Sequence, residues 1–306
     1  MSSVPKFKLN TGALIPSVGL GGWGGLTKEE RAATVPWFVT ALKSGYRHID
    51  TAWAYGTEKY VGEAIRQSGV PREEIWITTK LPWHHPGLRT AEQSIDESLK
   101  NLGTDYVDLY LLHWPQVIDW PDEDSEFLAE IKTRNSSPTF NETWVGLEEV
   151  YAKGKAKNIG VSNFSVQNLE KLLATAKIVP AVNQVELHPY LAQEELKAYC
   201  DSKGIVLTAY TPTGYNTVRS DPLIVELTRK YNVTPAQIIL AWHNSRGVVV
   251  VPKSSDAQRQ RDNLNLPNVA PEDLKRISAL DRNERLCNKA DPDGKVYGWT
   301  YEQLGW

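Results

Sequence analysis

The stretch GYRHIDTAWAYGTE, residues Gly45–Glu58, reads as a short strand, a loop and the start of a helix. Arg47 to Asp50 is expected to form the strand, and the loop that follows carries Tyr55. In folds made of parallel strands, reactive side chains are placed at the carboxyl ends of the strands. This stretch therefore predicts one strand–helix unit with an Asp and a Tyr at its functional edge.

The same alternation of strand and helix continues along the chain. Most of the expected strands are apolar on both faces, which is typical of parallel strands covered by helices. The expected strands are Ser17–Leu20, Arg47–Asp50, Ile75–Lys80, Val107–His113, Ala156–Val161, Ala181–Leu187, Ile205–Tyr210 and Val248–Val251. Eight such units predict an α/β fold, a TIM-type (β/α)8 barrel in which residues 1–306 form a single domain. An open doubly wound sheet is the alternative, but the glycine-rich first turn that such sheets use for dinucleotides is missing.

Segments outside this repeat are expected at the two ends of the barrel. Lys6 to Ile15, KFKLNTGALI, predicts a hairpin around an Asn-Thr-Gly turn. Thr27 to Glu30 predicts a capping box, and Pro36 predicts a kink or a late start in the helix that follows. Three aromatic-containing segments are expected to be long loops at the C-terminal face of the barrel: Trp114–Pro138, Thr211–Asp221 and Asp281–Trp306.

Composition narrows the classes of partner. The net charge is −3 and there is no basic tract, so nucleic acid is not an expected partner. No apolar run approaches the roughly 18 residues of a membrane span, and the N-terminus does not resemble a secretory signal. Cys200 and Cys287 have no metal-binding or redox spacing. We therefore expect a cytoplasmic, monomeric protein without a metal site.

Four polar residues fall at the ends of three consecutive expected strands: Asp50, Tyr55, Lys80 and His113. A Tyr hydroxyl has an ordinary pKa of about 10 and is a poor proton donor near neutrality. A nearby Lys ammonium is expected to lower that pKa, and an Asp can hold the Lys in place and charged. A neutral His can orient a carbonyl oxygen. Each residue alone has an ordinary structural explanation, but together they predict a proton donor for a carbonyl that receives a hydride.

Several motifs resemble those of the aldo-keto reductase family, in order and spacing, over nearly the whole chain. They are GYRHIDTAWAYGTEKYVGEAI (Gly45–Ile65), TTKLPW (Thr78–Trp83), DLYLLHWP (Asp108–Pro115), GVSNF (Gly160–Phe164), VNQVELHPY (Val182–Tyr190) and VPKS (Val251–Ser254). The resemblance implies that the N-terminal hairpin plugs the barrel floor. It also implies that Asp50, Tyr55, Lys80 and His113 are the catalytic tetrad, with Tyr55 as general acid in reduction and base in oxidation.

The resemblance further implies an NADPH/NADP+ site. Ser162, Asn163 and Gln184 match the residues that hold the nicotinamide carboxamide, and Tyr210 matches the ring that stacks on the nicotinamide. Thr211 and Thr213 stand where the family contacts the pyrophosphate, although Thr213 replaces the usual Leu. Lys253, Ser254 and Arg259 match the group that meets the adenosine 2′-phosphate, and two cations with a hydroxyl suit a dianion. Asp262 and Asn263 match the adenine side.

Four tryptophans are expected to wall the substrate pocket: Trp23, Trp53, Trp83 and Trp114. Such a pocket favours small aldehydes and ketones, including glyceraldehyde, sugar aldehydes and aromatic aldehydes, with reversible oxidation of polyols. The ending GWTYEQLGW (Gly298–Trp306) resembles fungal members of the family that interconvert glycerol and glyceraldehyde. A xylose-reductase-like enzyme, a uronate reductase and a non-enzymatic protein that binds cofactor and partners remain as alternatives.

Overall fold

Among the residues that the computed structural model describes (4–82, 90–116, 118–119, 132–133 and 139–306), eight parallel strands follow one another around the molecule in chain order. They are β3 (Leu20–Gly21), β4 (His48–Asp50), β5 (Trp76–Leu81), β6 (Leu109–Leu112), β9 (Ile159–Ser162), β10 (Val182–Glu186), β11 (Val206–Tyr210) and β12 (Val249–Val250). The first and last strands also meet. The Gly19 amide donates to the Val250 carbonyl at 2.8 Å, and the Val250 amide donates to the Ser17 carbonyl at 2.9 Å. The sheet therefore closes, which confirms the predicted barrel.

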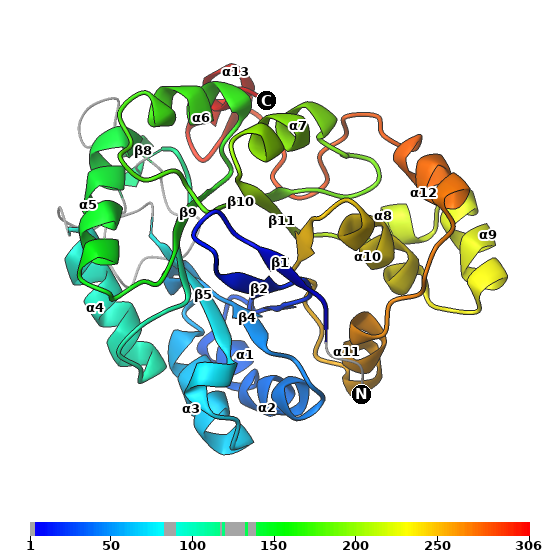
Figure 1. Ribbon diagram of the computed structural model, residues 1–306, viewed down its shortest axis with the longest axis horizontal. Helices are drawn as coiled ribbons and strands as arrows, with labels where there is room; N and C mark the ends of the chain where they lie inside the picture. Colours follow the sequence, from blue (N-terminus) through cyan, green and yellow to red (C-terminus); the bar gives the residue numbers. More distant parts are fainter. Residues whose placement is uncertain (1–3, 83–89, 117, 120–131, 134–138) are drawn as a thin grey trace.

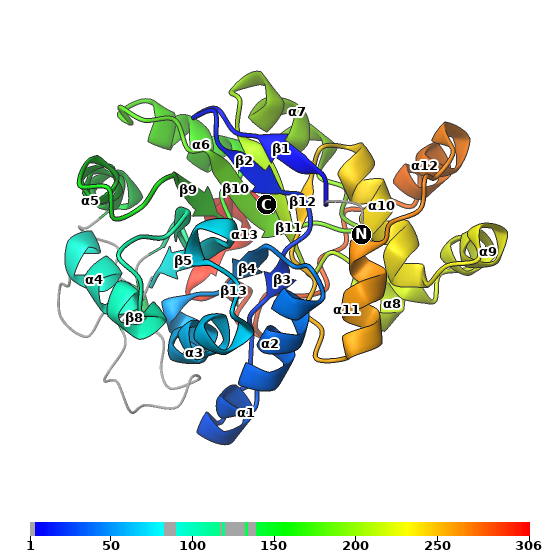
Figure 2. The same ribbon diagram turned by 60° about the horizontal axis from the view of Figure 1, so that its bottom comes forward.

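Helices surround the strands and cover the outer face of the sheet (Figure 1). The longer ones are α2 (Val35–Lys43), α3 (Glu58–Ser68), α4 (Ala91–Leu102), α5 (Phe140–Ala152), α6 (Val166–Leu173), α7 (Glu194–Ser202), α9 (Pro222–Tyr231), α10 (Pro235–Ser245), α11 (Ala257–Leu264) and α12 (Pro271–Ser278). The short ones are α1 (Lys28–Ala32), α8 (Tyr215–Arg219), α13 (Tyr301–Leu304) and the 3-10 turns η1 (Trp53–Tyr55) and η2 (Arg72–Glu74). Helices distant in sequence pack together: α11 lies beside α2 (Figure 2), where Gln260 Nε2 donates to the Trp37 carbonyl at 3.0 Å.

The N-terminal hairpin closes one end of the barrel. Strands β1 (Lys6–Lys8) and β2 (Leu14–Pro16) pair antiparallel and lie across the centre of the ring of strands in Figure 1. Ile15 is fully buried, and it packs in one apolar cluster with Trp76, Leu111 and Val249 from the barrel strands. This arrangement confirms the predicted plug.

Local sequence signals at the first helices are confirmed. Thr27 Oγ1 accepts from the Glu30 amide at 3.1 Å, and Glu30 Oε2 accepts from the Thr27 amide at 3.0 Å, so both halves of the capping box are present. Pro36 lies in the first turn of α2, where its missing amide hydrogen costs nothing, so the segment forms two helices in place of one.

All three loop predictions need revision. The segment Thr211–Asp221 was expected to be a loop, which is wrong for Tyr215–Arg219, because these residues form α8 after a left-handed Gly214. The tail contains the hairpin β13 (Lys295–Val296) and β14 (Trp299–Thr300) before α13. Within the expected loop Trp114–Pro138, the described residues include the paired strands β7 (Ile118–Asp119) and β8 (Lys132–Thr133).

The tail packs against Trp114 at the end of the barrel where the strands terminate. Trp114, Val296 and Leu304 are buried together, and the ring centroids of Trp114 and Tyr297 are 4.9 Å apart. Across the described ranges, the helices are too short or too polar to span a membrane.

Candidate active site

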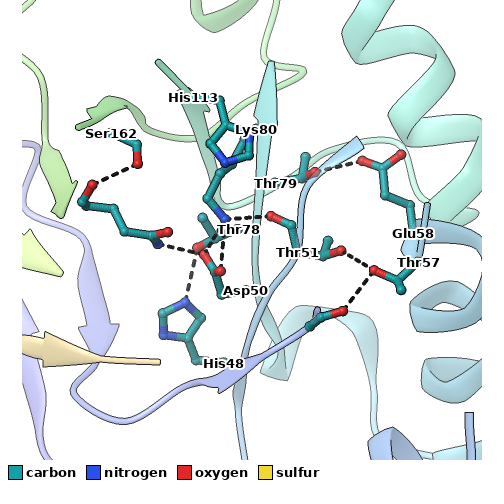
Figure 3. A network of polar contacts seen from close by, with 12 residues as sticks. His48, Asp50, Thr51, Thr57, Glu58, Thr78, Thr79, Lys80, His113 and Ser162 are labelled. Carbon is teal, nitrogen blue, oxygen red and sulfur yellow. Dashed lines mark hydrogen bonds and ion pairs between the residues drawn. The ribbon is translucent and has the colours of Figure 1, made fainter. Parts of the chain in front are cut away.

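A buried ion pair lies at the carboxyl ends of β4 and β5. Lys80 Nζ donates to Asp50 at 2.8 and 3.0 Å and to the Thr51 carbonyl at 2.9 Å (Figure 3). Lys80 has no exposed surface, and burial lowers the pKa of its ammonium group while the charge of Asp50 opposes that shift. Three acceptor contacts therefore fix the position of this cation, and the pairing with Asp50 is the one that the sequence predicted.

Asp50 is held by a second donor from across the barrel. Gln184 Nε2, on β10, donates to Asp50 Oδ1 at 2.7 Å. His48 lies beneath this group, where Nε2 hydrogen-bonds Thr78 Oγ1 at 3.1 Å, and burial lowers the pKa of His48 to about 4. Since His48 is neutral near pH 7, the charge of Asp50 is balanced by Lys80.

Tyr55 lies close to the ion pair. Lys80 Nζ is 5.0 Å from the centroid of the Tyr55 ring, and the His113 ring meets the Tyr55 ring edge-on at 5.8 Å between centroids. Trp23 makes a similar edge contact at 5.4 Å. The structure thus brings together the four residues that the sequence singled out at the strand ends.

The expectation that Lys80 lowers the pKa of Tyr55 is wrong for this structure. Burial raises the pKa of the Tyr55 phenol well above its ordinary value, and the charge of Asp50 raises it further. Desolvation, which disfavours the phenolate, is the largest cause of this shift. The Tyr55 hydroxyl therefore stays protonated throughout the neutral range.

Short polar contacts fix the loop that carries Tyr55. Thr51 Oγ1 and Thr57 Oγ1 share a hydrogen bond of 3.0 Å, and Thr57 Oγ1 donates to the Gly22 carbonyl at 3.0 Å (Figure 3). Gly56 ends η1 with a φ of 62°, a conformation that glycine adopts without strain. The loop is therefore tied to the segments that follow β4 and the neighbouring strand β3.

Polar side chains at the ends of β9, β10 and β11 form a connected group. Asn163 has a φ of 66°, and its Nδ2 donates to the His113 carbonyl at 3.0 Å and to Ser162 Oγ at 3.2 Å. Ser162 Oγ donates to the Gln184 carbonyl at 2.7 Å, and the Tyr210 hydroxyl donates to Asn163 Oδ1 at 2.7 Å. These bonds hold Asn163 in a conformation that non-glycine residues seldom adopt.

A cavity of about 520 Å³ opens over these groups. Of the residues predicted from the sequence, it is lined by Trp23, Asp50, Tyr55, His113, Trp114, Ser162, Asn163, Gln184, Tyr210, Thr211, Thr213 and Lys253. Lys80 lies below this lining and acts on it through Asp50 and Tyr55. The lining residues that were not predicted include Tyr215, Arg219, Cys287, Asn288 and Tyr297. The only sequence signal for these five was their place in two segments expected to be functional loops.

Other predicted residues lie outside the lining. Ser254 bonds to Asp256, and the Arg259 side chain, on α11, is 72% exposed with a loose contact of 3.8 Å to Asp256. Asp262 and Asn263 are on the same helix. Trp53, on η1, does not line the cavity, and Trp83 is outside the described residues. Within the described ranges, no three His, Cys, Asp or Glu side chains are grouped as metal ligands.

A buried carboxylate anchors the C-terminal segment to the barrel. Glu186 has no exposed surface, and Oε1 accepts from the amides of Leu286 at 2.6 Å and Cys287 at 2.9 Å. His188 Nε2 hydrogen-bonds the same oxygen at 3.1 Å. Burial acts to raise the pKa of Glu186, but these hydrogen bonds outweigh burial and lower it. The anchored segment continues to Asn288, whose Nδ2 donates to the Tyr210 hydroxyl at 2.6 Å.

Replacing Glu186 with Leu should loosen this segment, because four hydrogen bonds to a charged acceptor are lost inside the protein. We expect a loss of about 3 kcal/mol in the free energy of unfolding, and amide exchange about 100-fold faster at residues 286–288. Glu284→Gln in the same tail, at a partly exposed carboxylate, is the matched control. Unchanged exchange in the Leu variant would contradict the anchoring role.

Comparison with known proteins adds three findings. Residues 17–282 match the model of the Aldo/keto reductase family. The chain is 44% identical over 297 residues to a glycerol 2-dehydrogenase (NADP(+)) of Saccharomyces cerevisiae, covering 92% of each chain, and 42% identical to an aldehyde reductase of the same yeast, with the same coverage. It is also similar to the crystal structure of a Bombyx mori aldo-keto reductase in complex with NADP, with a TM-score of 0.84, 34% identity, and coverage of 99% of this chain and 100% of that one.

Proposed function

Because this chain belongs to the aldo/keto reductase family, we propose that it reduces small aldehydes and ketones with NADPH and oxidises the corresponding alcohols with NADP+. The observation that carries this proposal is the convergence of Tyr55 and His113 on one cavity wall above the buried Lys80–Asp50 pair. The connected polar side chains at the ends of β9, β10 and β11 are all present. They argue against a non-enzymatic protein that only binds cofactor and partners.

The cavity lining fits a nicotinamide dinucleotide. Side-chain amides and a hydroxyl from Ser162, Asn163 and Gln184 suit a carboxamide, and the Tyr210 ring beside them suits a flat heterocycle. Gly21 lines the same cavity, and a Cβ there would lie 2.7 Å from the Val251 carbonyl oxygen, so a larger residue would push apart the backbone segments that form this part of the lining. When bound, the reduced cofactor supplies a hydride to the carbonyl carbon.

The proton is the contribution of this chain. Tyr55 Oη, kept protonated by burial, donates to the carbonyl oxygen as the alcohol forms. His113 hydrogen-bonds the same oxygen and orients it. The Lys80 ammonium, 5.0 Å from the Tyr55 ring centroid, stabilises the negative charge that remains on Tyr55. Asp50 and the Thr51 carbonyl keep that ammonium in place.

The substrate is proposed to be a small, uncharged carbonyl compound such as glyceraldehyde, a short sugar aldehyde or an aromatic aldehyde. Trp23, Trp114 and Tyr297 give the cavity an aromatic lining, and Asn288 adds an amide that can hydrogen-bond a hydroxyl. Steady-state rates on a panel of aldehydes, ketones and polyols, with NADPH and with NADH, test this proposal. Absence of turnover on every carbonyl compound with both cofactors would refute it.

Preference for NADPH is proposed to depend on the cations of the β12–α11 segment. The double variant Lys253→Ala with Arg259→Ala should weaken NADPH binding about 100-fold. NADH binding should weaken less than about threefold, because only NADPH carries the 2′-phosphate. Dissociation constants from tryptophan fluorescence quenching measure both effects. Arg261→Ala, which removes an Arg from the same helix, is the control, and equal losses for the two cofactors would exclude this role.

A further inference from the structure

Two cations of the cavity lining have no carboxylate partner among the residues that the structure describes. Among the described residues, the charged side chains that line the cavity are Asp50, Arg219 and Lys253. Asp50 is already neutralised by Lys80. Arg219 is half-buried and makes no hydrogen bond or ion pair with another described residue, and Lys253 Nζ lies over the Trp37 ring at 5.9 Å. This part of the lining therefore carries uncompensated positive charge and is suited to an anion.

The two cations come from neighbouring strands of the barrel. Arg219 ends α8, the helix that follows β11, and Lys253 follows β12. Strands β11 and β12 pair directly, whereas β6, which leads to His113, lies four positions away from β12 in the order of strands. In an eight-stranded barrel that separation is half a turn. The cations therefore come from the side of the barrel opposite His113.

We propose that Arg219 binds the diphosphate group of the dinucleotide, an inference that rests on the cofactor use proposed above. A dinucleotide carries its diphosphate between the nicotinamide and adenosine ends. Tyr210 is proposed to contact the nicotinamide end, and Lys253 with Arg259 the adenosine end. Among the described residues, these assignments leave the diphosphate without a cation. Arg219 follows Tyr210, Thr211 and Thr213 along the same lining segment. Loops after the seventh and eighth strands are frequent phosphate sites in barrels of this type, and the fork of an Arg matches phosphate oxygens.

The experiment compares ligands that share or lack the diphosphate. Dissociation constants for NADPH, NADH and 2′-AMP, which has no diphosphate, are measured for the wild type and for Arg219→Ala, Arg219→Lys and Arg229→Ala. Arg229 is exposed on α9 and does not line the cavity, so its variant controls for the lost charge. We expect Arg219→Ala to weaken NADPH and NADH by the same factor, about 10- to 100-fold, and to leave 2′-AMP unchanged. Arg219→Lys should recover part of the loss.

Other outcomes separate this inference from the proposed function. If the wild type binds neither dinucleotide, the proposed function fails. If the wild type binds both and Arg219→Ala changes neither, only the diphosphate inference fails. A loss confined to NADPH and 2′-AMP would place Arg219 at the 2′-phosphate and overturn the inference. A variant that keeps its cofactor affinity but has a raised KM for an aldehyde with a carboxylate would also overturn it, and would show that Arg219 binds substrate.

Discussion

Tyr55→Phe is expected to reduce kcat for aldehyde reduction by about 1,000-fold or more, while the dissociation constant of NADPH changes by less than about threefold. The substitution removes the hydroxyl that donates the proton and keeps the ring that contacts Trp23 and His113. Stopped-flow measurement of nicotinamide absorbance under single-turnover conditions separates the chemical step from binding and product release.

The pH dependence gives a second readout of the same hydroxyl. Because burial raises the pKa of Tyr55 above its ordinary value of about 10, the acid form persists through neutral and mildly alkaline pH. Aldehyde reduction uses the acid form, so its rate should not fall through loss of the proton donor below about pH 10. Alcohol oxidation uses the base form, so its rate should increase as the pH rises.

A matched control is available on the adjoining helix. Tyr60, on α3, does not line the cavity, so Tyr60→Phe should keep nearly all of the activity. If Tyr55→Phe retains more than about a tenth of the wild-type kcat, another group donates the proton and the mechanism is wrong.

The barrel could be predicted because its determinants are local and repeated. Strands such as Leu109–Leu112 are apolar on both faces, and the capping box at Thr27 marks a helix start within four residues. Helix α8 could not be predicted in this way, because five residues are too few to show helical periodicity. Its place depends on Gly214 and on the buried Val218.

The candidate site was predictable where strand ends fix positions, and less so where the tail contributes. Asp50, Lys80 and His113 follow directly from the topology of parallel strands. Asn288 enters the lining because Glu186, about a hundred residues earlier, accepts the amides of Leu286 and Cys287. In the sequence, Glu186 is only a charged residue at the end of a strand. The direction of the pKa shift of Tyr55 also required the structure, because it depends on the depth of burial.

Lys80→Met is expected to cost about 3–5 kcal/mol of unfolding free energy and to reduce kcat by about 1,000-fold or more. The variant leaves the Asp50 carboxylate buried without its counter-ion, and it removes the charge that stabilises the Tyr55 phenolate. Chemical denaturation measures the first effect, and single-turnover reduction measures the second.

The double variant Lys80→Met with Asp50→Asn separates the two effects. The side-chain amide that Asp50→Asn introduces would still accept the hydrogen bond that Gln184 donates at this position, and the variant leaves no unpaired charge at positions 50 and 80. We expect the double variant to recover the free energy of unfolding to within about 1 kcal/mol of the wild type, because a buried ion pair contributes little beyond its neutral replacement. Activity should stay low, since the phenolate still lacks a nearby cation. If activity returns together with stability, Lys80 serves only the fold and has no part in proton transfer.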